Sequence, residues 1–134
     1  MWSDRYVGIP YADLGRTRDG CDCYGLVRLV YAGELGITLP PYLGYGSVEE
    51  HAEIAALIEG ARLSPFWQAV DAPAPFDIAV FRRGRLSTHL GIVIRPGLML
   101  HMQDEDCAKI ESWRGGVWGG RLTGHYRHIE GPAK

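Results

Sequence analysis

The stretch GCDCYGLVRLVY, residues 20–31, decides how this chain folds. Its apolar residues from Leu26 to Tyr31 recur at spacings of three and four, which predicts a helix that begins close to Cys23. We expect this helix to run to about Glu34 and to end near Gly36, because glycine is common just past a helix C-terminus. A cysteine thiol is therefore predicted at the start of a helix.

The predicted position of Cys23 favours ionisation of its thiol. Backbone N–H groups and the positive end of the dipole at a helix start stabilise an anion. Because the thiolate is the nucleophilic form of cysteine, this position indicates covalent catalysis. The alternative is a structural role, since cysteine is often buried as a small hydrophobe. Asp22 and Gly25 beside the thiol, and two histidines far downstream, favour catalysis.

Length and charge exclude several classes of protein. The 134 residues are expected to form a single domain, over residues 1–134. The net charge of -2 argues against a nucleic-acid partner, and no apolar run is long enough for a membrane span. Residues 1–5 show no signal-peptide pattern, so we expect synthesis in the cytoplasm without a secretion signal. An odd number of cysteines, three, does not suggest a disulfide framework.

Helical and strand-like patterns separate along the chain. A capping box at Ser47 and Glu50 predicts a second helix over about residues 48–59. Strand-like runs follow at residues 78–81, 89–94, 98–102, 109–111 and 125–129. Helices first and an antiparallel sheet after them define an α+β domain, with the first helix packed on one face of the sheet.

The strands at 89–94 and 98–102 carry one histidine each, His89 and His101, and are joined by a Pro-Gly turn. A two-residue loop would place the two histidines on opposite faces of the sheet. A loop of five residues, 94–98, would instead pair Gly91 with His101 and make His89 its diagonal neighbour, roughly 7–8 Å away. If the histidines share a site, we therefore predict a β-bulge or an odd-numbered loop in this hairpin.

Several motifs, taken in order, resemble the NlpC-type cell-wall peptidases, the NlpC and p-sixty family of papain-like cysteine peptidases. The matching runs are Gly8-Ile9-Pro10-Tyr11, Asp22-Cys23-Tyr24-Gly25-Leu26-Val27, His89-Leu90-Gly91-Ile92-Val93 and Leu100-His101. The resemblance covers about residues 6–128. It implies a papain-like α+β fold and hydrolysis of the peptidoglycan stem peptide between D-glutamate and diaminopimelate or lysine.

The resemblance also assigns roles to individual residues. Cys23 is implied as the nucleophile, His89 as the general base and acid, and His101 as the residue that orients His89. This Cys-His-His triad would form a thioester acyl-enzyme and requires no metal or other cofactor. We expect the oxyanion and the substrate to be held near Asp22, near Tyr24 and by the backbone N–H of Cys23. Tyr11 is a candidate second oxyanion donor or a core residue.

Two departures from the family pattern stand out. Tyr24 replaces the serine that usually follows the nucleophile, and Phe76 replaces a glycine that often precedes Asp77. The Gly-Cys-Asp-Cys start of residues 20–23 and the compact length look most like the bacteriophage tail-associated branch of the family. That likeness implies action at the cell wall as part of a phage tail or tail-like particle, with tail proteins as partners.

Three other interpretations stay open at this point. One is a papain-like amidase or acyltransferase with a different substrate, and another is a structural tail component that has lost activity. The third is a zinc site made of two thiolates and two imidazoles, although a Cys-x-Cys pair is tighter than the usual ligand spacing. Its ligands would be Cys21, Cys23, His89 and His101.

Overall fold

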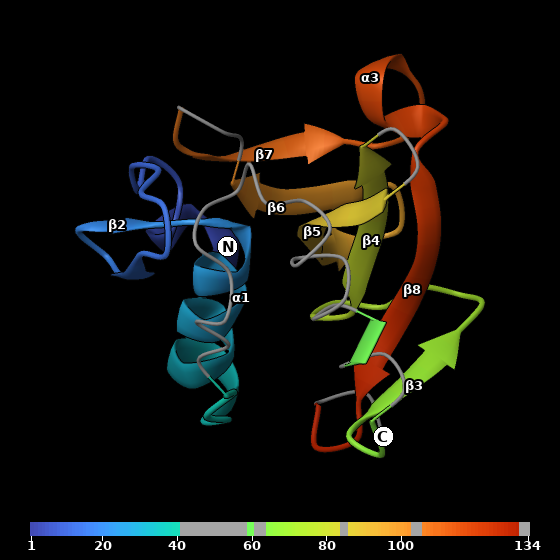
Figure 1. The fold of residues 1–134 in the computed structure, drawn as a ribbon, viewed down its shortest axis with the longest axis horizontal. Helices are drawn as coiled ribbons and strands as arrows, with labels where there is room; N and C mark the ends of the chain where they lie inside the picture. Colours follow the sequence, from blue (N-terminus) through green and yellow to red (C-terminus); the bar gives the residue numbers. More distant parts are fainter. Residues whose placement is uncertain (41–58, 61–63, 84–85, 103–105, 132–134) are drawn as a thin grey trace.

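The computed structural model describes residues 1–40, 59–60, 64–83, 86–102 and 106–131 (Figure 1). The N-terminal part consists of η1 (Trp2–Arg5), β1 (Arg16–Thr17), β2 (Gly20–Cys21), α1 (Cys23–Val30) and η2 (Tyr31–Leu35). The C-terminal part consists of β3 (Trp67–Val70), β4 (Ile78–Arg83), β5 (Leu86–Arg95), β6 (Leu98–Met102), β7 (Ala108–Ser112), α3 (Gly116–Gly119) and β8 (Leu122–His128).

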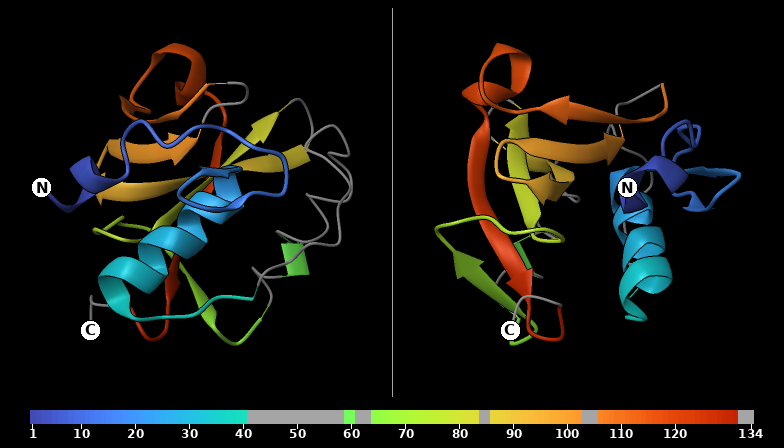
Figure 2. Two further views of the ribbon diagram at one scale, coloured as in Figure 1. Left: turned by 90° about the vertical axis from the view of Figure 1, so that its left-hand side faces the viewer. Right: turned by 180° about the vertical axis from the view of Figure 1, so that it is seen from behind.

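The later strands form one antiparallel sheet of six strands, in the order β3-β8-β4-β5-β6-β7. Helix α1 lies along one face of this sheet, as the side and back views in Figure 2 show. It packs against β5 and β6. The predicted α+β fold, with the first helix on one face of an antiparallel sheet, is confirmed. None of the helices in the described ranges is long and apolar enough to cross a membrane.

The first helix begins at Cys23, as predicted. Its regular α-helical part ends at Val30, and the chain then widens into the π-turn η2, which is closed by Gly36 at a φ of 67°. Within this turn, a Cβ on Gly33 would lie 2.5 Å from the hydroxyl at the end of the Tyr6 side chain. The helix therefore ends where the sequence indicated, but its last turn is wound differently.

The predicted strands are confirmed as β4, β5, β6, β7 and β8, with bounds that differ by a few residues. Strand β3 was not predicted. It lies at the edge of the described sheet and pairs there with β8, where Trp67 faces His128 and Val70 faces His125. The helix predicted over residues 48–59 falls almost wholly on residues outside the described ranges.

The hairpin of β5 and β6 contains the predicted irregularity. Gly91 pairs with His101 and Val93 with Met99, but the next pair joins Arg95 to Leu98, so Ile94 is an extra residue. This β-bulge gives the register that a five-residue loop would give. The prediction is therefore confirmed, and His89 and His101 become diagonal neighbours on one face.

Two hydrophobic clusters lie on the two faces of the sheet. The larger one holds α1 against β4, β5 and β6, through residues such as Leu26, Val30, Ile92 and Leu100. The smaller one consists of Ala79, Phe81, Val93, Met99, Trp113 and Trp118. Because side chains alternate along a strand, the same strands supply both clusters.

Candidate active site

The two histidines of the hairpin form a hydrogen-bonded pair. Nε2 of His89 lies 2.8 Å from Nδ1 of His101, and the rings are nearly perpendicular, at 87°. Both side chains are completely buried. At this distance one of the two facing nitrogens must carry a proton and the other must accept the hydrogen bond. The tautomer of one ring therefore determines the tautomer of the other.

Glu111 extends the pair into a chain of three polar side chains. Its Oε1 lies 2.8 Å from Nε2 of His101. The register explains this contact: β7 pairs with β6 so that Lys109 faces His101, and Glu111 follows two residues later on the same face. The sequence predicted a strand over 109–111, but it did not predict Glu111 as a site residue. Strand alternation could have located it only if the register between β6 and β7 had been known.

Aromatic side chains cover the histidine pair. The Trp118 ring stacks on His89 with 4.4 Å between ring centroids and 16° between planes, and it meets His101 edge-on at 5.3 Å. Phe81 contacts both Trp118 and His89. Excluding water in this way strengthens the hydrogen bonds along the chain. Trp118 was not predicted to belong to the site.

Cys23 is the first residue of α1 and is partly buried against the larger cluster. The described contacts therefore join His89, His101 and Glu111 directly. They join Cys23 to these residues through the packing of α1 on β5 and β6, the strands that carry the two histidines.

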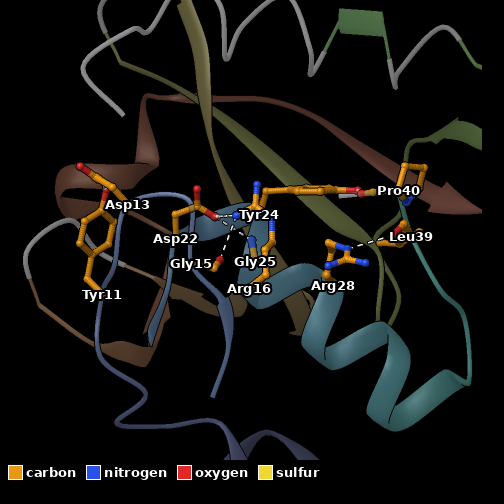
Figure 3. A network of polar contacts seen from close by, with 10 residues as sticks. All are labelled: Tyr11, Asp13, Gly15, Arg16, Asp22, Tyr24, Gly25, Arg28, Leu39 and Pro40. Atoms are coloured by element: carbon orange, nitrogen blue, oxygen red, sulfur yellow. Dashed lines mark hydrogen bonds and ion pairs between the residues drawn. The ribbon is translucent and has the colours of Figure 1, made fainter. Parts of the chain in front are cut away.

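Asp22 holds the start of α1 in place. Its buried carboxylate accepts a hydrogen bond of 2.8 Å from the backbone N–H of Gly25 and pairs with the Arg16 guanidinium at 2.8 Å (Figure 3). This is an N-cap, which satisfies one of the helix N–H groups that have no acceptor within the helix. The predicted role of Asp22 at the substrate stays a prediction beside this structural one.

The two tyrosines expected near the substrate make local contacts in the same region. The Tyr11 hydroxyl donates to the Asp13 carboxylate, and the Tyr24 hydroxyl donates to the Pro40 carbonyl at 2.6 Å (Figure 3). Tyr24 thus ties the extended segment after the helix back to the first turn of α1. Their roles in binding substrate or oxyanion also stay predictions.

Cys21 differs sharply from Cys23. Its side chain is fully buried, and that burial, followed by the nearby Asp22 carboxylate, raises the pKa of the Cys21 thiol to about 12. A thiol in this environment stays protonated at neutral pH and is a poor nucleophile. None of the three cysteines forms a disulfide. In the described part of the chain, no group of three or more His, Cys, Asp or Glu side chains is arranged to hold a metal ion, so the four ligands of the zinc hypothesis do not converge.

The fold and these side chains define a papain-like α+β domain with a cysteine at a helix start and a buried histidine pair on the sheet. The profile of the NlpC/P60 family matches residues 8–127. The chain therefore belongs to the NlpC/P60 family.

Solved structures show the same fold. The chain is similar to an NLP/P60 family protein, described as similar to a lipoprotein, from Staphylococcus aureus subsp. aureus Mu50, with a TM-score of 0.69, 23% identity and coverage of 96% of this chain and 39% of that one. It is similar to an NlpC/P60 family protein from Bacillus cereus ATCC 10987, with a TM-score of 0.68, 22% identity and coverage of 95% and 38%.

A third similar structure is the NlpC/p60 domain of the peptidoglycan hydrolase SagA, with a TM-score of 0.62, 19% identity and coverage of 92% and 91%. The chain thus spans about two-fifths of the length of the first and second of these proteins and nearly all of the SagA domain. No curated protein sequence matches the chain.

Proposed function

We propose that this protein is a cysteine endopeptidase that hydrolyses amide bonds of the peptidoglycan stem peptide, of the D-glutamyl-diaminopimelate type. The observation that carries the proposal is the buried pair in which Nε2 of His89 lies 2.8 Å from Nδ1 of His101. Such a pair orients a general base. Membership of the NlpC/P60 family and likeness to the domain of a peptidoglycan hydrolase support the choice of substrate.

The proposed reaction begins with proton transfer from the Cys23 thiol to Nδ1 of His89, the ring nitrogen that does not face His101. The thiolate attacks the amide carbonyl, whose oxygen becomes an oxyanion held by the backbone N–H of Cys23 and by the Tyr11 hydroxyl once that hydroxyl turns away from Asp13. His89 then returns the proton to the leaving amine as the C–N bond breaks, which leaves a thioester on Cys23.

Water completes the cycle. His89 takes a proton from the water molecule that attacks the thioester, and the C–S bond breaks to release the carboxylic acid. The thiolate regains the proton from His89, so the free enzyme is restored. No step in this scheme consumes a metal ion or a redox equivalent.

Variants of the three cysteines test the proposal. We expect Cys23→Ala to abolish release of the diaminopimelate-containing fragment from purified stem peptides, because the nucleophile is lost. Cys21→Ser and Cys107→Ser are the matched controls, and both should retain most of the activity. Product release is measured by liquid chromatography with mass spectrometry, and circular dichroism checks that each variant is folded. Activity in Cys23→Ala, or its loss in Cys21→Ser alone, would contradict the proposed nucleophile.

Alkylation of the native protein distinguishes the remaining functions. Iodoacetamide should label Cys23 rapidly from pH 5 to 9, with an apparent pKa well below the value of about 8.5 for an unperturbed thiol, and His89→Ala should slow this labelling. Rapid labelling without cleavage of stem peptides would favour a papain-like amidase or acyltransferase. A Cys23 no more reactive than Cys107 would favour a structural component without activity.

We further propose that the protein acts at the cell wall as part of a phage tail or tail-like particle. The support is the likeness of residues 20–23, Gly-Cys-Asp-Cys, to the tail-associated branch of the family. On this proposal the protein co-sediments with intact tail particles in a density gradient. A protein found only in the fractions without particles would refute it.

A further inference from the structure

We propose that Glu111 is a positioning residue of this site, whose carboxylate fixes the tautomers of both histidines and so leaves Nδ1 of His89 able to accept the proton of Cys23. The inference rests on the proposed thiol-peptidase function and deepens it. It adds a fourth member, from β7, to the three residues that the family resemblance implied.

The contact to Glu111 determines where the proton lies on His101. An ionised carboxylate can only accept a hydrogen bond, so Nε2 of His101, 2.8 Å from Oε1 of Glu111, must carry a proton. In a neutral imidazole the other nitrogen is then an acceptor. Nδ1 of His101 is therefore the acceptor in its contact with His89.

The same logic carries over to His89. Because Nδ1 of His101 accepts, Nε2 of His89 must donate across the 2.8 Å contact between them. His89 then has its proton on Nε2 and a lone pair on Nδ1. A base for the Cys23 thiol needs this tautomer. The Glu111 carboxylate determines it through two successive hydrogen bonds, one with His101 and one between His101 and His89.

Without the carboxylate the opposite arrangement becomes accessible. A proton on Nδ1 of His101 would be donated to Nε2 of His89, and the proton of His89 would then occupy Nδ1. In that state His89 could not take the thiol proton. Both imidazoles are completely buried, so water cannot impose the correct tautomer in place of Glu111.

Charges around the chain of three residues leave the Glu111 carboxylate available to His101. Its side chain is 38% exposed, so its outer side is hydrated. Lys109, which faces His101 from β7, is paired with Asp106 at 2.5 Å. The Arg121 guanidinium lies over the ring of Trp118, which covers the histidine pair, at 5.7 Å from the ring centroid.

Nuclear magnetic resonance of the full chain with ¹⁵N-labelled histidine tests the tautomers without requiring activity. We expect His101 to be neutral at pH 7.5 with its proton on Nε2, and His89 to carry a proton on Nε2 whether or not its Nδ1 has taken the proton of Cys23. In Glu111→Leu the His101 resonances should change to a mixture of tautomers. If His101 carries its proton on Nδ1 in the wild-type protein, or if Glu111→Leu changes neither ring, the inference is overturned.

Kinetics test the consequence for catalysis, with Glu130→Gln as the matched control because it removes the same charge from an exposed position outside the site. Glu111→Leu should lower kcat by about tenfold, a part of the 10²–10⁴-fold that general acid–base catalysis supplies, and should leave KM within about twofold. Glu111→Gln keeps an acceptor oxygen but loses the charge, so it should retain more kcat than the leucine variant. Wild-type kcat in Glu111→Leu would contradict the inference.

The pH profile separates the charge of Glu111 from its hydrogen bond. A negative charge near the imidazolium–thiolate pair stabilises the imidazolium, so its removal in Glu111→Gln should move the basic limb of kcat/KM to lower pH. The expected shift is about half a pH unit, because the Glu111 charge is partly exposed to solvent and the His101 ring separates it from His89. Glu130→Gln should not move it. A wild-type protein that is inactive but shows the Nε2–H tautomers would refute the proposed function and leave the positioning role intact.

Discussion

Phe76 adopts a backbone conformation that normally requires glycine. Its φ is +72°, in the left-handed region. Its backbone is held from two sides: its N–H donates to the Val93 carbonyl at 2.8 Å, and its carbonyl accepts from the Tyr31 hydroxyl. The ring offsets part of the strain by stacking on Trp2 with 4.5 Å between centroids. The side chain here thus supplies packing that a glycine would lack.

The backbone strain at Phe76 predicts that its glycine variant is more stable than its alanine variant. Phe76→Ala loses the ring and keeps the strain, whereas Phe76→Gly loses the ring and relieves the strain. We expect the glycine variant to be more stable than the alanine variant by about 1 kcal/mol, the typical cost of a non-glycine residue at positive φ. Urea unfolding monitored by tryptophan fluorescence measures the difference. Ala72→Gly, in the same loop at an ordinary φ, should be destabilising, and an alanine variant more stable than Phe76→Gly would disprove the argument.

At the scale of the elements, the start of α1 depends on close contact between the helix and the loop before it. A Cβ on Gly25 would lie 2.1 Å from the Gly15 carbonyl oxygen and 2.8 Å from Cβ of Cys21. Neither neighbour is the end of a flexible side chain. The glycine two residues after Cys23 is therefore required by packing, and it lets the loop support the turn that presents the thiol.

Replacing this glycine should destabilise the protein despite a better helix propensity. Alanine is favoured over glycine within a helix by about 1 kcal/mol. We nevertheless expect Gly25→Ala to lose about 3 kcal/mol or more, because rigid backbone must move to admit the methyl group. Gly33→Ala is the control, since the nearest atom there is the hydroxyl at the end of the Tyr6 side chain and not backbone, and its loss should be smaller. Equal stability of the two variants in thermal unfolding would contradict this account.

The elements also show what local pattern can and cannot predict. Helix α1 and its cap at Gly36 were predictable because apolar spacing and glycine position are local properties, and the bulge between β5 and β6 followed from the hypothesis that the two histidines share a site. Strand β3 was not, because its partner among the described strands is β8, more than fifty residues later in the sequence. Glu111 was missed for the same reason, since its contact with His101 depends on the register between β6 and β7.

At the scale of the whole molecule, hydrophobic clusters cover both faces of the sheet, and β8 pairs with β3 on one side and with β4 on the other. Its Arg127 makes a bidentate ion pair with the buried Asp77 of the turn before β4, with both N–O distances at 2.8 Å. This contact accounts for the raised pKa of Arg127. The same strand carries His125 and His128, which lie among aromatic rings near Trp113 and Trp67.

Burial of these two histidines makes global stability depend on pH. Desolvation lowers the pKa of both His125 and His128 below the usual value for histidine. The unfolded chain therefore binds protons at a higher pH than the folded one does, so stability is greatest above about pH 6.5 and falls as the pH decreases below it. The free energy of unfolding should be lower at pH 5.5 than at pH 7.5.

Replacing His125 should reduce the difference in the free energy of unfolding between pH 5.5 and pH 7.5. Nε2 of His125 is buried and has no hydrogen-bond partner among the described residues, so His125→Phe also removes an unsatisfied polar atom. We expect this variant to be at least as stable as the wild type at pH 7.5 and to lose less stability on going to pH 5.5. Val7→Ala changes an exposed residue without a titrating group and should keep the wild-type pH dependence. If His125→Phe loses as much stability as the wild type between the two pH values, protonation of His125 is not coupled to unfolding, and other groups such as His128 carry the effect.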